Sequence, residues 1–284
     1  MRDLNRALED YAALLPRTDV AAIVVRDGVI EFESRIAPVR FRCDVGDPSL
    51  PPLVALALGC YEPVEMRLLR ELLPGARGFL DVGANIGWYS LHAASLFPDL
   101  RVVAAELVPT TAAILSHNVE LNGARVEVVS KGLSDAVGEV EVWASPQFSG
   151  SASVAPSREY AGARPQRAPV TTLDALVDEY GLSVDVLKAD VEGGELAVLR
   201  GGLRTIERDR PAMMLELLRI HAAPFGYHPN DVLDLLAGFG YETWALSPAG
   251  IRRFERMTEA TEETNFLFLH RDSHAAISVS RAAG

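Results

Sequence analysis

From residue 78 onward, short apolar segments alternate with segments of helical periodicity, and this alternation constrains the fold more than any other feature. Strands joined through helices at this spacing form a mostly parallel sheet that is covered by helices on both faces. The sequence therefore predicts an α/β core over residues 78–270. Its expected strands are residues 79–82, 102–106, 126–129, 184–189, 212–216, 241–245 and 265–270.

Residues 1–77 lack this alternation and are predicted to form a small helix-and-strand extension that ends in a lead-in helix. A 25-residue stretch at 145–169 is rich in Ser, Gly, Ala and Pro, has no period and is predicted to be a lid or substrate loop. Residues 138–144 are expected to form a short strand near residues 126–129, and residues 271–284 a disordered tail. In the extension we expect helices at 3–15 and 62–73 and strands at 20–25, 29–35 and 39–43.

The charge balance excludes several classes of protein. With 27 basic and 39 acidic residues, the formal net charge is −12, which argues against nucleic-acid binding and against a polybasic membrane anchor. The two cysteines form no Cys-x-x-Cys motif and no cluster with histidine. We expect a cytoplasmic protein that acts on a small molecule. The sequence is compatible with a homo-oligomer.

The segment from Asp81 to Gly87 joins the first core strand to the next helix and is the most informative motif. In an open α/β sheet, this first turn lies where ligands bind. Its pattern is Asp-x-Gly-x-Asn-x-Gly, whereas a dinucleotide site needs a glycine at the position of Asn85. Asp81 would repel a phosphate but can hold an ammonium group. The motif therefore favours S-adenosylmethionine over a nicotinamide dinucleotide.

Glu106 ends the second core strand, where a carboxylate can accept hydrogen bonds from both ribose hydroxyls. A nicotinamide dinucleotide would use the same carboxylate, so Glu106 supports a nucleoside ligand without identifying it. Together with the glycine loop and the strand order, it makes a nucleoside-binding site the preferred interpretation.

A second charged segment follows the fourth core strand. If that strand stays extended, Lys188, Asp190 and Glu192 share one side, and charges in such a buried place need partners or a function. We interpret Asp190 and Glu192 as catalytic candidates, whereas Glu195 is expected to cap the next helix. Lys188 either neutralises these neighbours or takes part in the reaction.

Two mechanisms remain open at this end of the sheet. Asp190 and Glu216, from the ends of neighbouring strands, could hold one Mg²⁺ that orients a substrate hydroxyl. Alternatively, a carboxylate or His221 takes the hydroxyl proton without a metal. His92 lies within a helix and is expected to be structural.

Taken together, these motifs resemble the FkbM-family methyltransferases, a branch of the class I S-adenosylmethionine-dependent enzymes. The resemblance covers about residues 61–217, and its strength lies in the order and spacing of motifs that are individually weak. The motifs are Tyr61-Glu62-Pro63, Leu80 to Gly87, Leu121-Asn122-Gly123, Leu133-Ser134-Asp135 with Gly138, Thr172-Leu173-Asp174, Leu187 to Glu195, Leu199 to Gly202, and Arg210 to Glu216.

The resemblance implies a Rossmann-like sheet of seven strands with the last strand antiparallel. It also implies methyl transfer to oxygen, often on sugars or secondary metabolites. The sequence departs from the family at Leu107, where a proline more often follows the acidic residue directly. By the resemblance, the cofactor-binding residues would be Glu62, Asp81, Gly83, Asn85, Gly87 and Glu106, with Leu133 and Ser134 near the adenine.

We therefore expect an S-adenosylmethionine-dependent O-methyltransferase for a sugar or polyketide-type metabolite. Its extension and the loop at 145–169 would select the acceptor. Three rivals remain: a nicotinamide-dependent reductase, disfavoured by Asn85; an RNA ribose methyltransferase, disfavoured by the net charge; and a cofactor-binding protein without activity.

Overall fold

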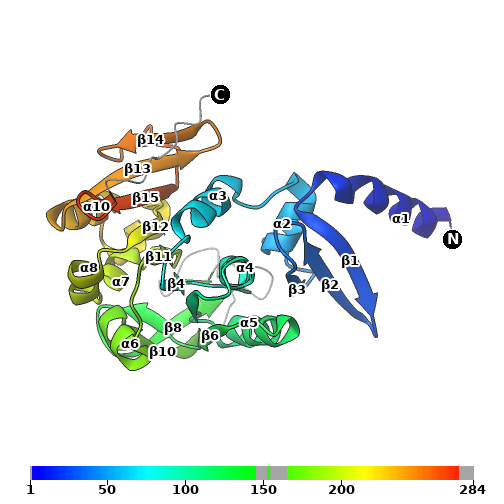
Figure 1. Cartoon of the computed structure of the whole chain (residues 1–284), viewed down its shortest axis with the longest axis horizontal. Helices are drawn as coiled ribbons and strands as arrows, with labels where there is room; N and C mark the ends of the chain where they lie inside the picture. The colour runs from blue at the N-terminus through cyan, green and yellow to red at the C-terminus, as the bar shows by residue number, and fades with distance from the viewer. Residues whose placement is uncertain (1, 145–151, 154–164, 275–284) are drawn as a thin grey trace.

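The computed structural model describes residues 2–144, 152–153 and 165–274, and its largest sheet has the strand order β14-β13-β15-β12-β11-β4-β5-β6 (Figure 1). All seven predicted core strands are present, and β14 is an eighth that was not predicted. The strands are β4 (Gly78–Val82), β5 (Arg101–Ala105), β6 (Val126–Val129), β11 (Val186–Ala189), β12 (Ala212–Glu216), β13 (Tyr241–Ser247), β14 (Gly250–Phe254) and β15 (Asn265–His270).

The strand directions confirm the predicted sheet. Strand β4 pairs in parallel with β5 and β11, and β15 runs antiparallel to both β12 and β13. Strand β14 pairs with β13 as a hairpin at the sheet edge. Two of its five residues, Arg252 and Arg253, are exposed. The strand therefore has no apolar run by which it could be predicted from the sequence.

Helices cover both faces of the sheet because successive strand residues point to opposite sides. Phe79 belongs to a core cluster with α3 (Pro63–Leu72) and α4 (Trp88–Leu96), and α5 (Pro109–Asn122) lies on the same side. Leu80 belongs to the cluster on the opposite face. That face is covered by α6 (Leu173–Tyr180), α7 (Glu195–Arg200), α8 (Leu203–Asp209) and α10 (Pro229–Gly238).

The N-terminal part contains the expected helix and three strands, followed by a helix that was not predicted. Helix α2 (Pro51–Leu58) starts with two prolines and ends at Gly59, whose φ is 95°. Proline suits the first helical position and glycine the C-terminal end, so these residues indicated a helix. The apolar run between them has no helical periodicity, and the helix was therefore not predicted. The other elements are α1 (Arg2–Leu14), a 3₁₀ helix (Leu15–Arg17), β1 (Val20–Arg26), β2 (Val29–Ser34) and β3 (Arg40–Arg42).

Two asparagines of α5 attach this N-terminal sheet to the core. The side-chain amide of Asn118 accepts a hydrogen bond from Arg42 N at 2.8 Å and donates to Arg42 O at 3.1 Å. Asn122, one turn further along the same helix face, makes the same pair of bonds with the backbone of Arg40. The two amides thus pair with the edge of β3 as a neighbouring strand would.

A second sheet of four strands, in the order β7-β10-β8-β9, lies beside the main one. The prediction that residues 138–144 pair near residues 126–129 is wrong, because β8 pairs with β10 and β9. Val142 and Ala168 are fully buried in one apolar cluster, and this burial drives the pairing of β8 with β10. The strands are β7 (Gly132–Ser134), β8 (Gly138–Ala144), β9 (Ala152–Ser153) and β10 (Gln166–Thr172).

The loop prediction at 145–169 is therefore wrong for residues 166–169, which belong to β10. It is also wrong for the two residues of β9. Residues 145–151 and 154–164 of the predicted lid, and residues 275–284 of the predicted tail, lie outside the described part of the chain.

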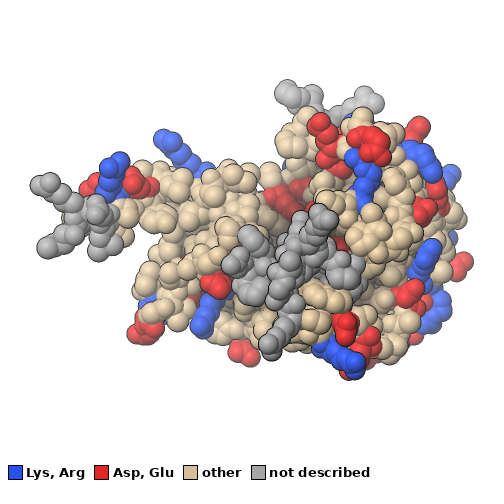
Figure 2. Space-filling view, turned by 180° about the vertical axis from the view of Figure 1, so that it is seen from behind, with Lys and Arg blue, Asp and Glu red and all other residues tan. Residues whose placement is uncertain are grey.

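On the face shown in Figure 2, lysine and arginine side chains alternate with acidic ones around the larger body. Acidic side chains are also visible in the recess where the narrow N-terminal part meets that body. Over the described residues, no helix has both the length and the apolar composition that crossing a bilayer requires.

A buried histidine joins the N-terminal sheet to α4. His92 is fully buried, with Nδ1 at 2.6 Å from Trp88 O and Nε2 at 2.7 Å from Ser34 Oγ. Burial lowers the pKa of His92 from 6.5 to about 4, because the surrounding apolar atoms disfavour its charged form. His92 is thus the structural residue that was predicted.

This pKa predicts a loss of stability in mild acid. Because the folded pKa is depressed, the contribution of His92 is complete above pH 6.5 and is lost as pH falls towards 4, by about 3 kcal/mol in all. In urea unfolding at pH 7 and pH 5, His92→Gln should flatten the pH dependence of the unfolding free energy. An equal pH dependence in His92→Gln and in the wild type would contradict this assignment.

Candidate functional site

A cavity of about 320 Å³ opens at the carboxyl ends of β4, β5, β11 and β12. Residues from all four strand ends line it, together with the loops that follow them. The N-terminal part contributes Ser49 and Pro51, so the cavity lies between that part and the core sheet. An edge of this kind, where several parallel strands end, is the usual ligand site of an α/β sheet.

The loop after β4 requires glycine because it passes directly over the end of β11. Gly83 has φ +77°, and a Cβ atom there would lie 1.9 Å from the carbonyl oxygen of Asp190. The N–H groups of Gly83 and Ala84 both donate to the carbonyl oxygen of Ala105 at the end of β5. The loop is therefore fixed against both neighbouring strands.

Asp81 presents a buried carboxylate oxygen that has no partner. Its Oδ2 accepts a hydrogen bond from Ser90 Oγ at 2.5 Å, while Oδ1 has no partner among the described residues. Burial raises the pKa of Asp81, although nearby Lys188 acts in the opposite direction. Within the described part of the chain, the side-chain oxygen of Asn85 also lacks a partner. Two such buried acceptors on the cavity wall are arranged for a ligand that donates hydrogen bonds.

Glu106 follows β5 and is oriented by backbone donors. Its two oxygens accept from Asn85 N at 2.9 Å and Val108 N at 2.8 Å. Burial raises the pKa of Glu106 to about 7, against the effect of these two bonds. A carboxylate has about four acceptor sites, so Glu106 can still accept from a ligand in the cavity.

Lys188 is the buried counter-charge of the site. Its Nζ lies 3.1 Å from Asp190 Oδ2 and 4.7 Å from the centre of the Tyr89 ring. Burial alone would lower the pKa of Lys188, but the carboxylates of Asp190, Glu62 and Asp81 raise it above its usual value. Lys188 is therefore a buried cation that is paired with its acidic neighbours.

Three residues on the cavity wall, Glu62, Asn85 and Glu192, hold a left-handed backbone with φ of 44°, 49° and 53°. Non-glycine residues adopt this conformation at a cost, and it is common at functional sites. Glu62 also accepts a short hydrogen bond from the Tyr89 hydroxyl. Burial and the repulsion of Asp190 raise its pKa to about 7, although Lys188 opposes this.

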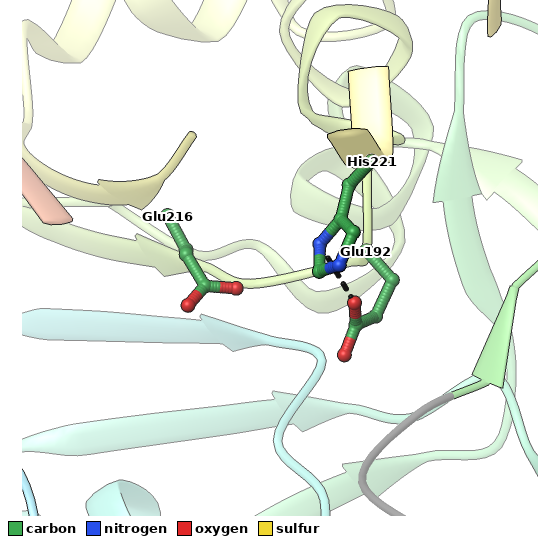
Figure 3. Close-up of side chains that lie close together, drawn as sticks. All are labelled: Glu192, Glu216 and His221. Atoms are coloured by element: carbon green, nitrogen blue, oxygen red, sulfur yellow. Dashed lines mark ion pairs between the residues drawn. The ribbon is translucent and has the colours of Figure 1, made fainter. Parts of the chain in front are cut away.

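Glu192, Glu216 and His221 converge beyond β11 and β12, with the imidazole between the two carboxylates in Figure 3. His221, on helix α9 (Arg219–Ala222), places Nδ1 2.9 Å from Glu192 Oε2. The adjacent Glu192 carboxylate raises the pKa of His221, against the effect of burial. Gly193 permits this approach, because a Cβ there would lie 2.2 Å from the His221 carbonyl oxygen.

Asp190 and Glu216 hold different protonation states. Burial would raise the pKa of Asp190, but Lys188 lowers it below its usual value. Burial and the adjacent Asp190 carboxylate raise the pKa of Glu216 to about 10. At neutral pH, Asp190 is ionised while Glu216 keeps its proton.

The cavity brings most of the predicted site residues together. Among the described residues, His221 does not line the cavity, but it contacts Glu192, which lines it. Gly87 does not line it either, since a Cβ there would instead meet Leu115 Cδ1 at 2.6 Å. Glu195 is structural as expected, because it accepts from the backbone N–H of Val191 and Gly193. The predicted residues on the wall are Glu62, Asp81, Gly83, Asn85, Glu106, Leu133, Ser134, Asp190, Glu192 and Glu216.

Four aromatic residues line the cavity without having been predicted as site residues. Tyr61 belongs to the Tyr61-Glu62-Pro63 motif, and Trp88 and Tyr89 follow the motif that ends at Gly87, so their positions in the sequence were the available signal. Phe225 comes from a 3₁₀ helix (Ala223–Phe225) and had no signal in the sequence. Aromatic residues of this kind are more often core residues than ligand contacts, so only the fold distinguishes the two.

The predicted metal ligands are placed differently by the structure. Ligand atoms of Glu192, Glu216 and His221 all lie within 4.8 Å of one another. Asp190 is not a member of this group and pairs with Lys188. The structure therefore brings one of the two predicted ligands, Glu216, together with the catalytic candidates Glu192 and His221.

Comparison with known families and proteins shows similarity to methyltransferases. The family model described as the methyltransferase FkbM domain matches residues 81–243. The chain is 30% identical over 159 residues to methyltransferase SdnD of Sordaria araneosa, covering 45% of this chain and 61% of the relative. It is 29% identical over 175 residues to the hexuronic acid methyltransferase AglP of Haloferax volcanii, covering 61% and 66%. The chain thus spans less than two thirds of each relative.

Among solved structures, the chain is similar to a methyltransferase FkbM from Methylobacillus flagellatus KT. The TM-score is 0.44 at 15% sequence identity, and the match covers 94% of this chain and 60% of that one.

Proposed function

Since the chain belongs to the FkbM methyltransferase family, we propose that it transfers a methyl group from S-adenosylmethionine to a hydroxyl oxygen of a small molecule. The observation that carries the proposal is the unpartnered, buried Oδ1 of Asp81 on the wall of a cavity that also contains Glu106. We assign the acceptor to sugars or polyketide-type metabolites. The hexuronic acid specificity in the name of the Haloferax relative supports the sugar class.

The polar groups near β4 and β5 suit the two ends of S-adenosylmethionine. The buried acceptors of Asp81 and Asn85 match an ammonium group, whereas the Asp81 carboxylate would repel the pyrophosphate of a dinucleotide. Glu106 has acceptor capacity left for ribose hydroxyls. Leu133 and Ser134 line the same cavity and would contact the adenine.

When bound, S-adenosylmethionine supplies an activated methyl group, so this chain must orient the acceptor hydroxyl and remove its proton. The ionised Asp190 and the carboxylate of Glu192 both line the cavity and can accept that proton. Glu216, with a pKa of about 10, can instead donate a hydrogen bond to an acceptor oxygen. Lys188 positions Asp190, and His221 positions Glu192.

The cofactor assignment predicts the effect of Asp81→Asn. The amide keeps the size of the side chain but loses its charge, so S-adenosylmethionine should bind about 10- to 100-fold more weakly by calorimetry. Asp99→Asn, a change at an exposed residue outside the cavity, should bind as the wild type does. Equal affinity in both variants would contradict the role of Asp81. A wild-type protein that binds NADH and not S-adenosylmethionine would overturn the whole proposal.

The catalytic assignment predicts that Asp190→Asn reduces turnover by about 10²- to 10⁴-fold, the usual contribution of a proton acceptor. Because the substitution is nearly isosteric, the fold and the cofactor affinity should be retained, while the thermal unfolding midpoint should fall because the buried Lys188 loses its nearest carboxylate. Turnover is measured from product mass with sugar and polyketide acceptors, again with Asp99→Asn as the control. Near-normal turnover in Asp190→Asn would remove this residue from the mechanism. Cofactor binding without any methylated product would favour a cofactor-binding protein without activity.

A metal-assisted form of the same reaction is a second candidate, supported by the convergence of Glu192, Glu216 and His221. Carboxylate oxygens suit Mg²⁺, which would orient the acceptor hydroxyl and lower its pKa. In this form, treatment with EDTA should abolish turnover and added Mg²⁺ should restore it. If the reaction needs no metal, neither EDTA nor added Mg²⁺ should change turnover.

A further inference from the structure

Trp88 carries a buried hydrogen-bond donor that has no partner among the described residues. The side chain is 3% exposed, and its indole Nε1 makes no hydrogen bond. A buried N–H without a partner is rare in folded proteins, because its lost hydration is not replaced. Trp88 also lines the cavity proposed to hold the cofactor and the acceptor. We propose that this N–H is a specificity-determining donor to an oxygen atom of the bound ligand.

The ring of Trp88 is held rigidly by aromatic neighbours from both parts of the chain. It stacks on Phe41 of the N-terminal sheet, with ring centres 5.0 Å apart and planes at 26°. Tyr61 and His92 make edge contacts with it at 5.7 Å and 4.6 Å. His92 is in turn bonded to Ser34 of the same N-terminal sheet. The donor is therefore preorganised, and the N-terminal sheet sets its position.

The chemistry of the donor selects the kind of ligand atom. The indole N–H can donate and cannot accept, so its partner must be an atom with a free lone pair, and we assign an oxygen. Asp81 and Asn85, the other unpartnered groups on this wall, are acceptors and require the opposite kind of atom. The wall as a whole thus favours a ligand that presents both a donor group and an acceptor oxygen.

Either the methyl acceptor or the cofactor can supply such an oxygen. One is a hydroxyl or carbonyl oxygen of the methyl acceptor, which the nearby Ser49 and Pro51 of the N-terminal part would also contact. The other is the carboxylate at the amino-acid end of the cofactor. Both satisfy the same donor, and separate measurements of cofactor and acceptor affinity distinguish them.

The proposal rests on the proposed function and is tested in the full chain with Trp88→Phe, which keeps an aromatic ring and removes the N–H. Trp244→Phe on β13 is a matched control, because the Trp244 Nε1 also lacks a partner but its side chain does not line the cavity. The measurements are calorimetric affinity for S-adenosylhomocysteine, KM for the methyl acceptor, and the thermal unfolding midpoint.

A contact with the cofactor carboxylate predicts that Trp88→Phe weakens S-adenosylhomocysteine binding about 10- to 100-fold, the usual effect of losing a hydrogen bond to a charged group. A contact with the acceptor predicts unchanged cofactor affinity and a KM for the acceptor raised about two- to tenfold, the usual effect of losing one neutral hydrogen bond. Trp244→Phe should change neither quantity. If Trp88→Phe matches the wild type in both, or if Trp244→Phe shows the same loss, the proposal is wrong. A wild-type protein that binds no S-adenosylhomocysteine would instead refute the proposed function itself.

Discussion

The buried ammonium of Lys188 allows several carboxylates to lie together at the carboxyl ends of the strands. Without it, Asp81 and Asp190, which extend from adjacent strands, would repel each other in a place from which water is largely removed. With it, Asp190 stays ionised while Glu216 keeps its proton, so neighbouring carboxyl groups differ in chemistry at the same pH. The proposed division of roles between proton acceptor and hydrogen-bond donor depends on that single cation.

The N-terminal part is built into this site. Val20 and Phe41 belong to the same buried cluster as Phe79 of the main sheet, so the extension and that face of the core share one apolar interior. The same Phe41 stacks on Trp88 at the cavity wall. This contact gives a physical basis to the prediction that the first sixty residues select the acceptor, because a change in the N-terminal sheet would move a side chain that lines the cavity.

The sequence was informative where local chemistry determines structure. Alternating apolar runs predicted the seven core strands, and the glycines around Asp81 predicted the turn, because its backbone conformation and close approach exclude larger residues. It was uninformative where distant segments decide the outcome. Pairing of β8 with β10 depends on the shared burial of Val142 and Ala168, which no local pattern shows. Likewise, Trp88 gives the same apolar signal in a sequence whether its ring packs in the core or lines a cavity.

We propose that the loop after β4 and the end of β5 hold the two ends of one S-adenosyl ligand. A crystal structure of the full chain with S-adenosylhomocysteine tests this most directly. We expect the ligand amine within hydrogen-bond distance of Asp81 and the ribose hydroxyls at Glu106. Ligand density elsewhere on the protein, or an adenosine oriented the opposite way in this cavity, would contradict it.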